Sequence, residues 1–356
     1  MPLPSGALAV VLAVQSASVP ATHQHTHGSA APAQVAAAAA VPASRPPLAV
    51  TTDSSEHEIT IEYRVSAMPE SHAHAGHEGH AGHVQRMVRF PAPITGWFRA
   101  ARLELTGPDG QPIPQRALHH FNLLNLSRRQ LVHGGVERMW AAGQETEATA
   151  LPAGVGMPIS DTMTLGVVVA YDPADLPPGS TVRLHLLWTP RNTVPRPVDI
   201  YPLALDVNYL VGESAAYDLP PGRSERSFEF AMPIDGRMLG VGGHMHDYGE
   251  SLSLVDLKTG RTVFELEAVK DSTGRVISIP RQVYGVAGRG RKLEAGRRYR
   301  VTAVYENPTG AMIPLGGMGE IGIGFTPDDF DEWPALDRSD PDIAGDLANL
   351  ESFEQR

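Results

Sequence analysis

The sequence predicts an all-β protein built from two tandem, antiparallel, jelly-roll-like β-sandwich domains. The first observation is a hydrophobic period of two, in which Ile59, Ile61 and Tyr63 alternate with polar residues. A strand with one buried face produces this pattern. The second is the number of turn formers, 35 Gly and 31 Pro in 356 residues, which implies many short elements. The third is that no segment between residues 57 and 327 carries a convincing helical stripe.

The same alternation places further strands along the chain. It recurs at residues 181–188, 264–268, 299–305 and 321–325, with turn sequences at 107–110, 175–180, 258–260 and 294–296. A Pro-rich stretch at 189–202 interrupts the series, as expected between two sandwiches. We therefore predict an N-terminal sandwich over residues 57–200 and a C-terminal sandwich over residues 201–327.

The first 56 residues have the pattern of an extension rather than of a sandwich. Residues 1–21 contain the apolar run Ala7–Val14 followed by small residues, which is typical of a signal peptide. Export to the periplasm or the exterior is therefore expected. Residues 22–56 are rich in Ala, Pro, His and Thr without any period, which favours a disordered linker.

The other end has the composition of an acidic tail. Residues 328–356 carry ten Asp and Glu but only two Arg, and we expect this segment to be loosely attached. Within it, Ile343, Leu347 and Leu350 have the spacing of a short amphipathic helix.

Composition excludes several classes of function. The net charge of −11 disfavours binding to nucleic acid, which needs a basic surface. The absence of cysteine excludes disulfides, thiolate metal sites and thiol nucleophiles. Beyond the signal segment no apolar run approaches the roughly 18 residues of a membrane span. We expect a monomer that acts on a small-molecule or peptide-like partner.

Histidine is the residue type that most suggests a metal-binding site, and the chain contains 15 of them. Eight lie in two low-complexity patches, namely His23, His25, His27, His72, His74, His77, His80 and His83. Imidazoles on such a segment bind Cu(II), Ni(II) or Zn(II) opportunistically. The alternative is that both patches are solvated loops without a role.

A sharper signal is the sequence GGHMHD at residues 242–247. Residues i and i+2 of a strand share a face, so His244 and His246 present two imidazoles together. Met318, just before the strand at 321–325, is the candidate third ligand. A thioether beside two imidazoles suits copper. The alternative is a half-exposed strand with two hydrogen-bonded histidines.

The sequence LHHF at residues 118–121 adds a second pair, His119 and His120. Neighbouring strand residues face opposite sides, so such a pair can chelate one ion only at a bulge or an edge. His133 lies 13 residues further along and is another candidate ligand. His185, in the middle of a strong strand, is more readily explained as structural.

The order of these motifs resembles the copper type II, ascorbate-dependent monooxygenases, which include peptidylglycine α-hydroxylating monooxygenase and dopamine β-monooxygenase. The resemblance covers roughly residues 85–326. It implies two jelly-roll-like domains with one copper each. His244, His246 and Met318 match the ligands of the catalytic copper, and His119 with His120 match two ligands of the electron-transfer copper. The implied activity is hydroxylation of a C–H bond by O2 with an ascorbate-type reductant.

The sequence departs from this family in three places. Ala170 stands where the family has the third histidine of the electron-transfer copper, so His133 or the segment 72–83 must substitute, or only one copper is held. Gly242 stands where the amidating enzyme has an arginine that anchors its peptide, so peptide amidation is not expected. The cysteines of the family are missing.

Three functions therefore remain open. The first is a copper-dependent monooxygenase, an oxidoreductase in which Asp247, Tyr248 or Glu250 supplies outer hydrogen bonds to the ligands. The second is a non-enzymatic periplasmic protein that binds or sequesters copper, favoured by the histidine patches and the altered first site. The third is an adhesion or structural protein.

Overall fold

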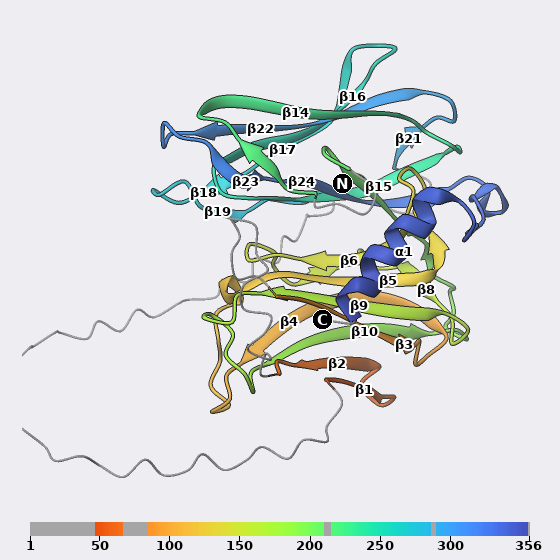
Figure 1. Ribbon diagram of the computed structural model, residues 1–356. Coiled ribbons are helices and arrows are strands. Elements are labelled where there is room, and N and C mark those ends of the chain that lie inside the picture. Colours follow the sequence, from red (N-terminus) through yellow and green to blue (C-terminus); the bar gives the residue numbers. More distant parts are fainter. Residues whose placement is uncertain (1–46, 67–83, 210–214, 286–289, 355–356) are drawn as a thin grey trace, which may run out of the picture. The chain divides into compact units, whose positions relative to one another are not determined.

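The computed structural model describes residues 47–66, 84–209, 215–285 and 290–354. The expected signal segment, most of the expected linker and both low-complexity histidine patches lie outside these ranges. Within them, strands dominate, and most pair with antiparallel neighbours (Figure 1). The prediction of an all-β sandwich fold is therefore confirmed.

The first sandwich consists of two facing sheets. Sheet 1 runs β1 (Leu48–Asp53), β2 (Glu58–Arg64), β10 (Thr181–Pro190), β4 (Gly96–Thr106), β8 (Val155–Ile159) and β11 (Val198–Asp199), with β7 (Thr149–Ala150) on β4. Sheet 2 runs β3 (Val84–Pro91), β9 (Thr164–Tyr171), β5 (Leu118–Arg129) and β6 (Val136–Ala142). Alternate side chains of these strands point inward, and Ile61, Phe121 and Val169 belong to one buried core.

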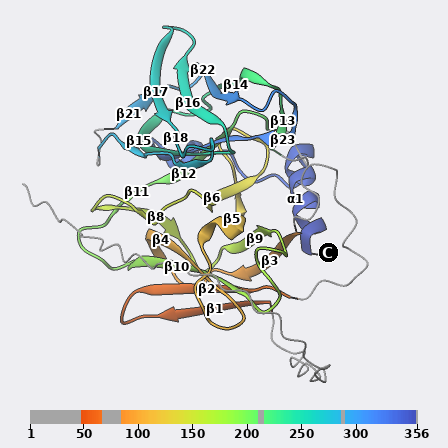
Figure 2. The ribbon, with the colours of Figure 1, turned by 90° about the vertical axis from the view of Figure 1, so that its left-hand side faces the viewer.

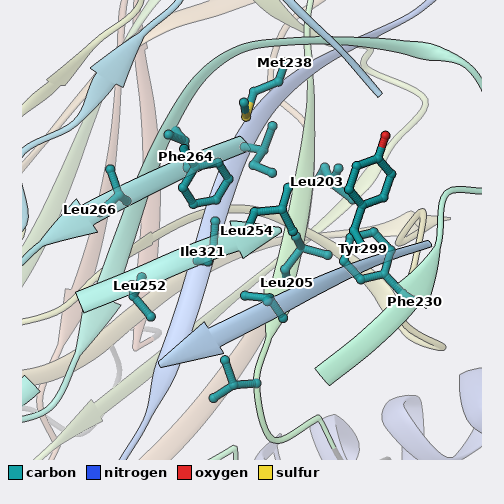
Figure 3. Packing of buried hydrophobic residues seen from close by; sticks show 14 of the residues in the cluster. Leu203, Leu205, Phe230, Met238, Leu252, Leu254, Phe264, Leu266, Tyr299 and Ile321 are labelled. Carbon is teal, nitrogen blue, oxygen red and sulfur yellow. The ribbon is translucent and has the colours of Figure 1, made fainter. Parts of the chain in front are cut away.

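The second sandwich repeats this plan. Sheet 3 runs β12 (Tyr201–Asp206), β24 (Gly319–Pro327), β15 (Gly236–Met245) and β20 (Gln282–Val283), with β21 (Arg291–Leu293) on β15. Sheet 4 runs β14 (Gly222–Ala231), β22 (Arg298–Asn307), β16 (Gly249–Asp256) and β17 (Arg261–Glu267). Two hairpins complete it, β13 (Tyr217–Leu219) with β23 (Ile313–Gly317), and β18 (Val269–Lys270) with β19 (Val276–Ser278). Figure 3 shows its separate core, where Leu205 and Ile321 of sheet 3 meet Leu254 and Phe264 of sheet 4.

The first sandwich begins earlier than the sequence predicts. Strand β1 lies inside the segment 22–56, for which the composition predicts a disordered linker. It pairs with β2 along its whole length, from Leu48 opposite Tyr63 to Asp53 opposite Glu58. The Thr-rich sequence of β1 gives little hydrophobic alternation, because the strand lies at the edge of sheet 1 and most of its side chains are exposed.

The acidic tail is not loosely attached, which corrects the expectation from its charge. Its predicted helix is α1 (Pro341–Glu354), which lies beside sheet 2 in Figures 1 and 2. Ile343, Leu347 and Leu350 are buried against the outer face of that sheet. Asp346 accepts hydrogen bonds from the Arg138 guanidinium and from the Val136 backbone N–H. The described part of the chain has no helix long and apolar enough to cross a membrane.

Candidate metal centre

The pair His119 and His120 lies at the first residues of β5, where the strand is irregular. Opposite it on β9, Leu118 pairs with Tyr171 and His120 with Ala170, so His119 is an extra residue of a bulge. A bulge changes the direction in which a side chain points. The two imidazoles consequently lie together, with ring centroids 4.2 Å apart. The bulge that this sequence requires for chelation is therefore present.

The pair His244 and His246 lies where β15 ends. Met245 between them is buried in the core of the second sandwich, so its neighbours point away from that core, as the period of a strand requires. The two imidazole centroids are 5.5 Å apart. Both side chains are largely shielded from solvent, with 13% exposure for the His244 side chain and 9% for His246.

The structure brings the two pairs together. The Nε2 atoms of His120 and His244 are 3.0 Å apart, although the residues are 124 positions apart in the chain. Among the described residues, candidate ligand atoms of His119, His120 and His246 lie within 4.8 Å of one another. The resemblance assigns these pairs to two different coppers, whereas the fold gathers them in one cluster, hereafter the histidine cluster.

The spacing within the histidine cluster fits a shared metal ion. Two nitrogens bound at about 2.0–2.1 Å to one ion are about 2.9 Å apart at a right angle and about 3.4 Å apart at a tetrahedral angle. The distance between the Nε2 atoms of His120 and His244 lies in this interval, which is also the range of a hydrogen bond between the two rings. Neutral imidazoles are ligands for copper, zinc and nickel, so the donor set suits a transition metal.

Glu145 fixes the orientation of His244 from the other sandwich. Its Oε1 is 2.7 Å from the His244 Nδ1, and its side chain is only 2% exposed. A carboxylate on one ring nitrogen directs the other nitrogen to a metal and increases its basicity. The second carboxylate oxygen, Oε2, is buried without a hydrogen-bond partner among the described residues. Such a carboxylate needs a nearby positive charge, which His244 or a bound ion supplies.

The loop that carries Glu145 is held in place by a residue just before the HH pair. The Gln115 side-chain amide donates to the carbonyls of Gly143 and Thr146 at 2.7 and 2.6 Å. A Cβ on Gly143 would lie 2.8 Å from Glu145 Oε2 and 2.9 Å from the His244 ring. Glycine is therefore required for this close approach. Sequence reasoning missed Glu145, because the local sequence around it carries no metal signature.

The surroundings of His244 favour a positive charge there. Burial lowers the pKa of His244, but the carboxylates of Glu145, Glu320 and Asp206 outweigh this effect and raise the pKa to about 9. Desolvation, reinforced by Glu320, raises the pKa of Asp206 to about 8. Asp206, Glu320 and His244 are direct neighbours across β12, β24 and β15. A proton or a metal cation on the His244 ring relieves the repulsion within this row.

The backbone of Met318 is linked to the backbone of His246 through the side chain of Tyr305. The Tyr305 hydroxyl donates to the Met318 carbonyl and accepts from the Met318 N–H at 3.0 Å. The same hydroxyl accepts from the His246 N–H at 3.1 Å. One buried phenol therefore ties the backbone of His246 to that of the proposed thioether ligand. Burial raises the pKa of Tyr305, so the hydroxyl stays protonated and can make all three contacts.

Other predicted residues have different partners. The His133 Nε2 accepts the Asp206 N–H at 3.0 Å, and its ring stacks on Tyr209. Burial, and then the charge of Arg138, lower its pKa to about 4. The His185 Nδ1 lies 2.6 Å from Glu58 on sheet 1. Both histidines have structural partners of their own.

Two residues proposed as outer hydrogen-bond partners of the ligands are also occupied elsewhere. Asp247 accepts from the Val276 N–H, and Glu250 pairs with Lys270. The outer carboxylate on His244 thus comes from Glu145, 99 residues away in the chain.

A cleft of about 400 Å³ opens beside the histidine cluster. His120 and His244 lie in its lining together with residues of β6 and of sheet 3. Arg281 crosses from the second sandwich and donates to the carbonyls of Ala148 and Glu147 at 3.1 and 2.8 Å. The volume is that of a small-molecule site, and the site adjoins two of the candidate ligands.

Comparison with known proteins gives only distant likenesses. No protein-family model matches the chain, and no curated protein matches its sequence. Among solved structures, PNGF-II is 10% identical with a TM-score of 0.36, and the match covers 75% of this chain and 65% of that one, less than two thirds of its length.

Two further structures are similar to the same degree. PNGase F, a glycosylasparaginase from Flavobacterium meningosepticum, is 10% identical with a TM-score of 0.33 over 74% and 95% of the two chains. The major capsid protein P2 of bacteriophage PM2 is 10% identical with a TM-score of 0.32 over 79% and 99%. TM-scores below 0.5 at this identity carry no information on activity.

Proposed function

We propose that the protein binds one copper ion between its two sandwiches and uses it to oxidise a small molecule in the adjoining cleft. The observation that carries the proposal is the convergence of His119 and His120 from one sandwich with His244 and His246 from the other. Several imidazole nitrogens gathered around one point form a donor set for a single transition-metal ion.

Copper is proposed over zinc for two reasons. Met318 lies beside His246 through the Tyr305 hydroxyl, and a thioether is a ligand for Cu(I) but a poor one for zinc. The order of the motifs also resembles the copper monooxygenases. His244, held by Glu145 through Nδ1, presents Nε2 to the ion, and the same Glu145 balances part of the charge that the ion brings.

The cleft supports an enzymatic role. When bound, copper would supply reductive activation of O2, with two electrons from an external reductant such as ascorbate and two protons, so that one oxygen atom enters a C–H bond and the other leaves as water. The protein's own groups perform the positioning. Glu145 orients His244, Tyr305 fixes the backbone at His246, and the walls of the cleft hold the substrate and exclude water.

Copper binding without catalysis is the second candidate, and one observation favours it. The two pairs expected to hold two coppers meet in one cluster, and Ala170 opposite His120 provides no further ligand. A single copper has no neighbouring metal from which to take the second electron. A protein that only sequesters copper needs no such electron, whereas an enzyme must take it from the reductant directly.

The two candidates are separated by measurements on the full chain. Copper per chain is counted after exhaustive dialysis for wild type, His244→Ala and the control His185→Ala, and ascorbate-driven O2 uptake is recorded for each. We expect His244→Ala to hold one copper fewer than wild type and to lose O2 uptake, with His185→Ala unchanged. Equal copper content would refute the site. Loss of copper with O2 uptake unaffected would refute the enzymatic role and leave sequestration.

A further inference from the structure

The face of sheet 3 that borders the cleft is almost free of side chains beyond the metal centre. The cross-strand rows on this face, starting from the histidine cluster, are His244–Glu320–Asp206, then Gly242–Gly322–Ala204, then Gly240–Gly324–Pro202. The alternate residues of the same strands, such as Ile321 and Ile323, point into the core. Two successive rows of this face therefore carry only glycine, alanine and proline, and they are hereafter called the glycine floor.

The glycine floor is open at Gly322, whereas a Cβ on Gly324 would lie 3.5 Å from the Ile200 Cδ1 and one on Gly240 would lie 3.2 Å from the Gln282 carbonyl oxygen. A Cβ built on Gly322 meets no atom of the described residues within 4 Å, and the φ of Gly322 is not in the left-handed region. A Cβ on Gly242 would meet the Arg281 Cγ at 3.3 Å, so the Arg281 side chain lies over that part of the floor. Because Arg281 is held by the carbonyls of Glu147 and Ala148, it forms a fixed boundary of the open space above Gly322.

The first sandwich contributes apolar side chains to the same cleft. Met139, Trp140 and Leu151 belong to its lining, and Trp140 is held edge-on against Phe121 with ring centroids 6.2 Å apart. A surface of small residues with apolar side chains in the same cleft favours flat molecules, because a flat face can reach van der Waals contact with the open part of the floor around Gly322.

We propose that the glycine floor binds an uncharged, flat aromatic molecule whose edge reaches the histidine cluster. The proposal rests on the proposed function and names the class of its substrate. Successive rows on one strand face are about 6.7 Å apart, so a ring over Gly322 brings its edge to the row of His244. The Glu320 carboxylate in that row disfavours an anionic ligand, and the Arg281 guanidinium is already bound by the carbonyls of Glu147 and Ala148.

The test uses 2-naphthol, an uncharged flat fluorescent molecule, as the probe. Its binding to the full chain is measured by fluorescence for wild type, Gly322→Ala, Gly322→Leu and the control Ala231→Leu. Ala231 is an exposed position at the end of β14 and does not line the cleft. We expect Gly322→Leu to weaken binding by about tenfold, Gly322→Ala to weaken it less, and Ala231→Leu to leave it unchanged. Circular dichroism and copper content verify that each variant is folded.

Two related probes test the shape and the charge of the ligand. Decahydro-2-naphthol has the same skeleton but is not flat, and 2-naphthoate is flat but anionic. We expect both to bind at least about tenfold more weakly than 2-naphthol. Equal binding of 2-naphthol to wild type and Gly322→Leu, or equal binding of the flat and the non-flat alcohol, would overturn the proposal.

The result is separable from the metal proposal. The same titrations are run on metal-free wild type and on His244→Ala, because the floor lies in the rows beyond the ligands. Binding of 2-naphthol that persists without copper and is lost in Gly322→Leu supports the glycine floor even if the copper site fails. Copper binding by a protein that shows no preference for the flat probe refutes the glycine floor alone.

Discussion

Glu145 of the first sandwich holds the imidazole of His244, a residue of the second sandwich, through an Oε1–Nδ1 contact of 2.7 Å. This contact makes the orientation of one candidate ligand depend on the other half of the protein. The His120–His244 contact at 3.0 Å likewise joins a residue of the first sandwich to one of the second. The candidate metal centre is therefore a property of the two sandwiches together, and neither half of the chain contains it alone.

Replacing Glu145 by glutamine removes the charge while keeping the size of the side chain. We expect Glu145→Gln to weaken copper binding by about ten- to hundredfold, since the outer carboxylate fixes the tautomer and the basicity of the ligand. The measurement is a competitive titration against a chelator of known affinity. Glu147→Gln is the matched control, because Glu147 is exposed two residues away and its hydrogen bond with Arg281 is made by the backbone carbonyl, which the substitution retains. Equal affinities in all three proteins would show that Glu145 has no influence on the ion.

Met318→Leu tests whether the thioether is a ligand. Leucine keeps the apolar volume but has no donor atom, and the backbone contacts with Tyr305 are retained. We expect the affinity for Cu(I) to fall by about tenfold and that for Cu(II) to change little, because sulfur selects the reduced ion. The copper reduction potential should fall accordingly. A variant with unchanged Cu(I) affinity and potential would exclude Met318 from the ligand set.

His133 gives a prediction for the dependence of stability on pH. Its pKa is about 4 in the folded protein, lowered by burial and by Arg138, against about 6.5 when unfolded. Above pH 6.5 neither state binds a proton at this residue. As the pH falls from 6.5 to 4, only the unfolded state binds a proton at this residue. The free energy of unfolding therefore decreases, by about 3 kcal/mol in total.

Urea unfolding of the metal-free protein at a series of pH values measures this slope. His133→Gln retains a hydrogen-bond acceptor for the Asp206 N–H but does not titrate. It should lower stability at neutral pH and flatten the slope between pH 6.5 and 4. An identical slope in the variant would assign the acid sensitivity to other groups.

An ion pair between Arg138 and the buried Asp346 carboxylate helps to hold helix α1 on sheet 2. Asp346 is 4% exposed, and its carboxylate accepts hydrogen bonds from the Arg138 guanidinium and from the Val136 N–H. Asp346→Ala leaves the arginine without its partner and should cost about 3 kcal/mol of stability. Glu351→Ala on the same helix breaks an exposed pair with Arg89 and should cost about 0.5 kcal/mol or less. Similar losses in urea unfolding for the two variants would contradict this distinction.

Charge is a poor guide to the attachment of the acidic tail. Ten acidic residues suggest a loosely attached segment, but the apolar spacing of Ile343, Leu347 and Leu350 outweighs them. These three residues supply one buried face, and the outer face of sheet 2 offers Met87, Leu124 and Val168 to cover. A sequence shows that a helix has an apolar face; it does not show which surface that face will meet.

Side-chain direction within a single element is encoded locally, and it could be predicted from the sequence. The period of two gives the β class, the HxH spacing puts His244 and His246 on one face, and the adjacent pair at 119–120 requires a bulge. The meeting of the two pairs, the role of Glu145 as outer carboxylate and the open space above Gly322 arise only in the folded chain. Contacts between residues 99 and 124 positions apart depend on how two sandwiches pack, and no local pattern encodes that packing.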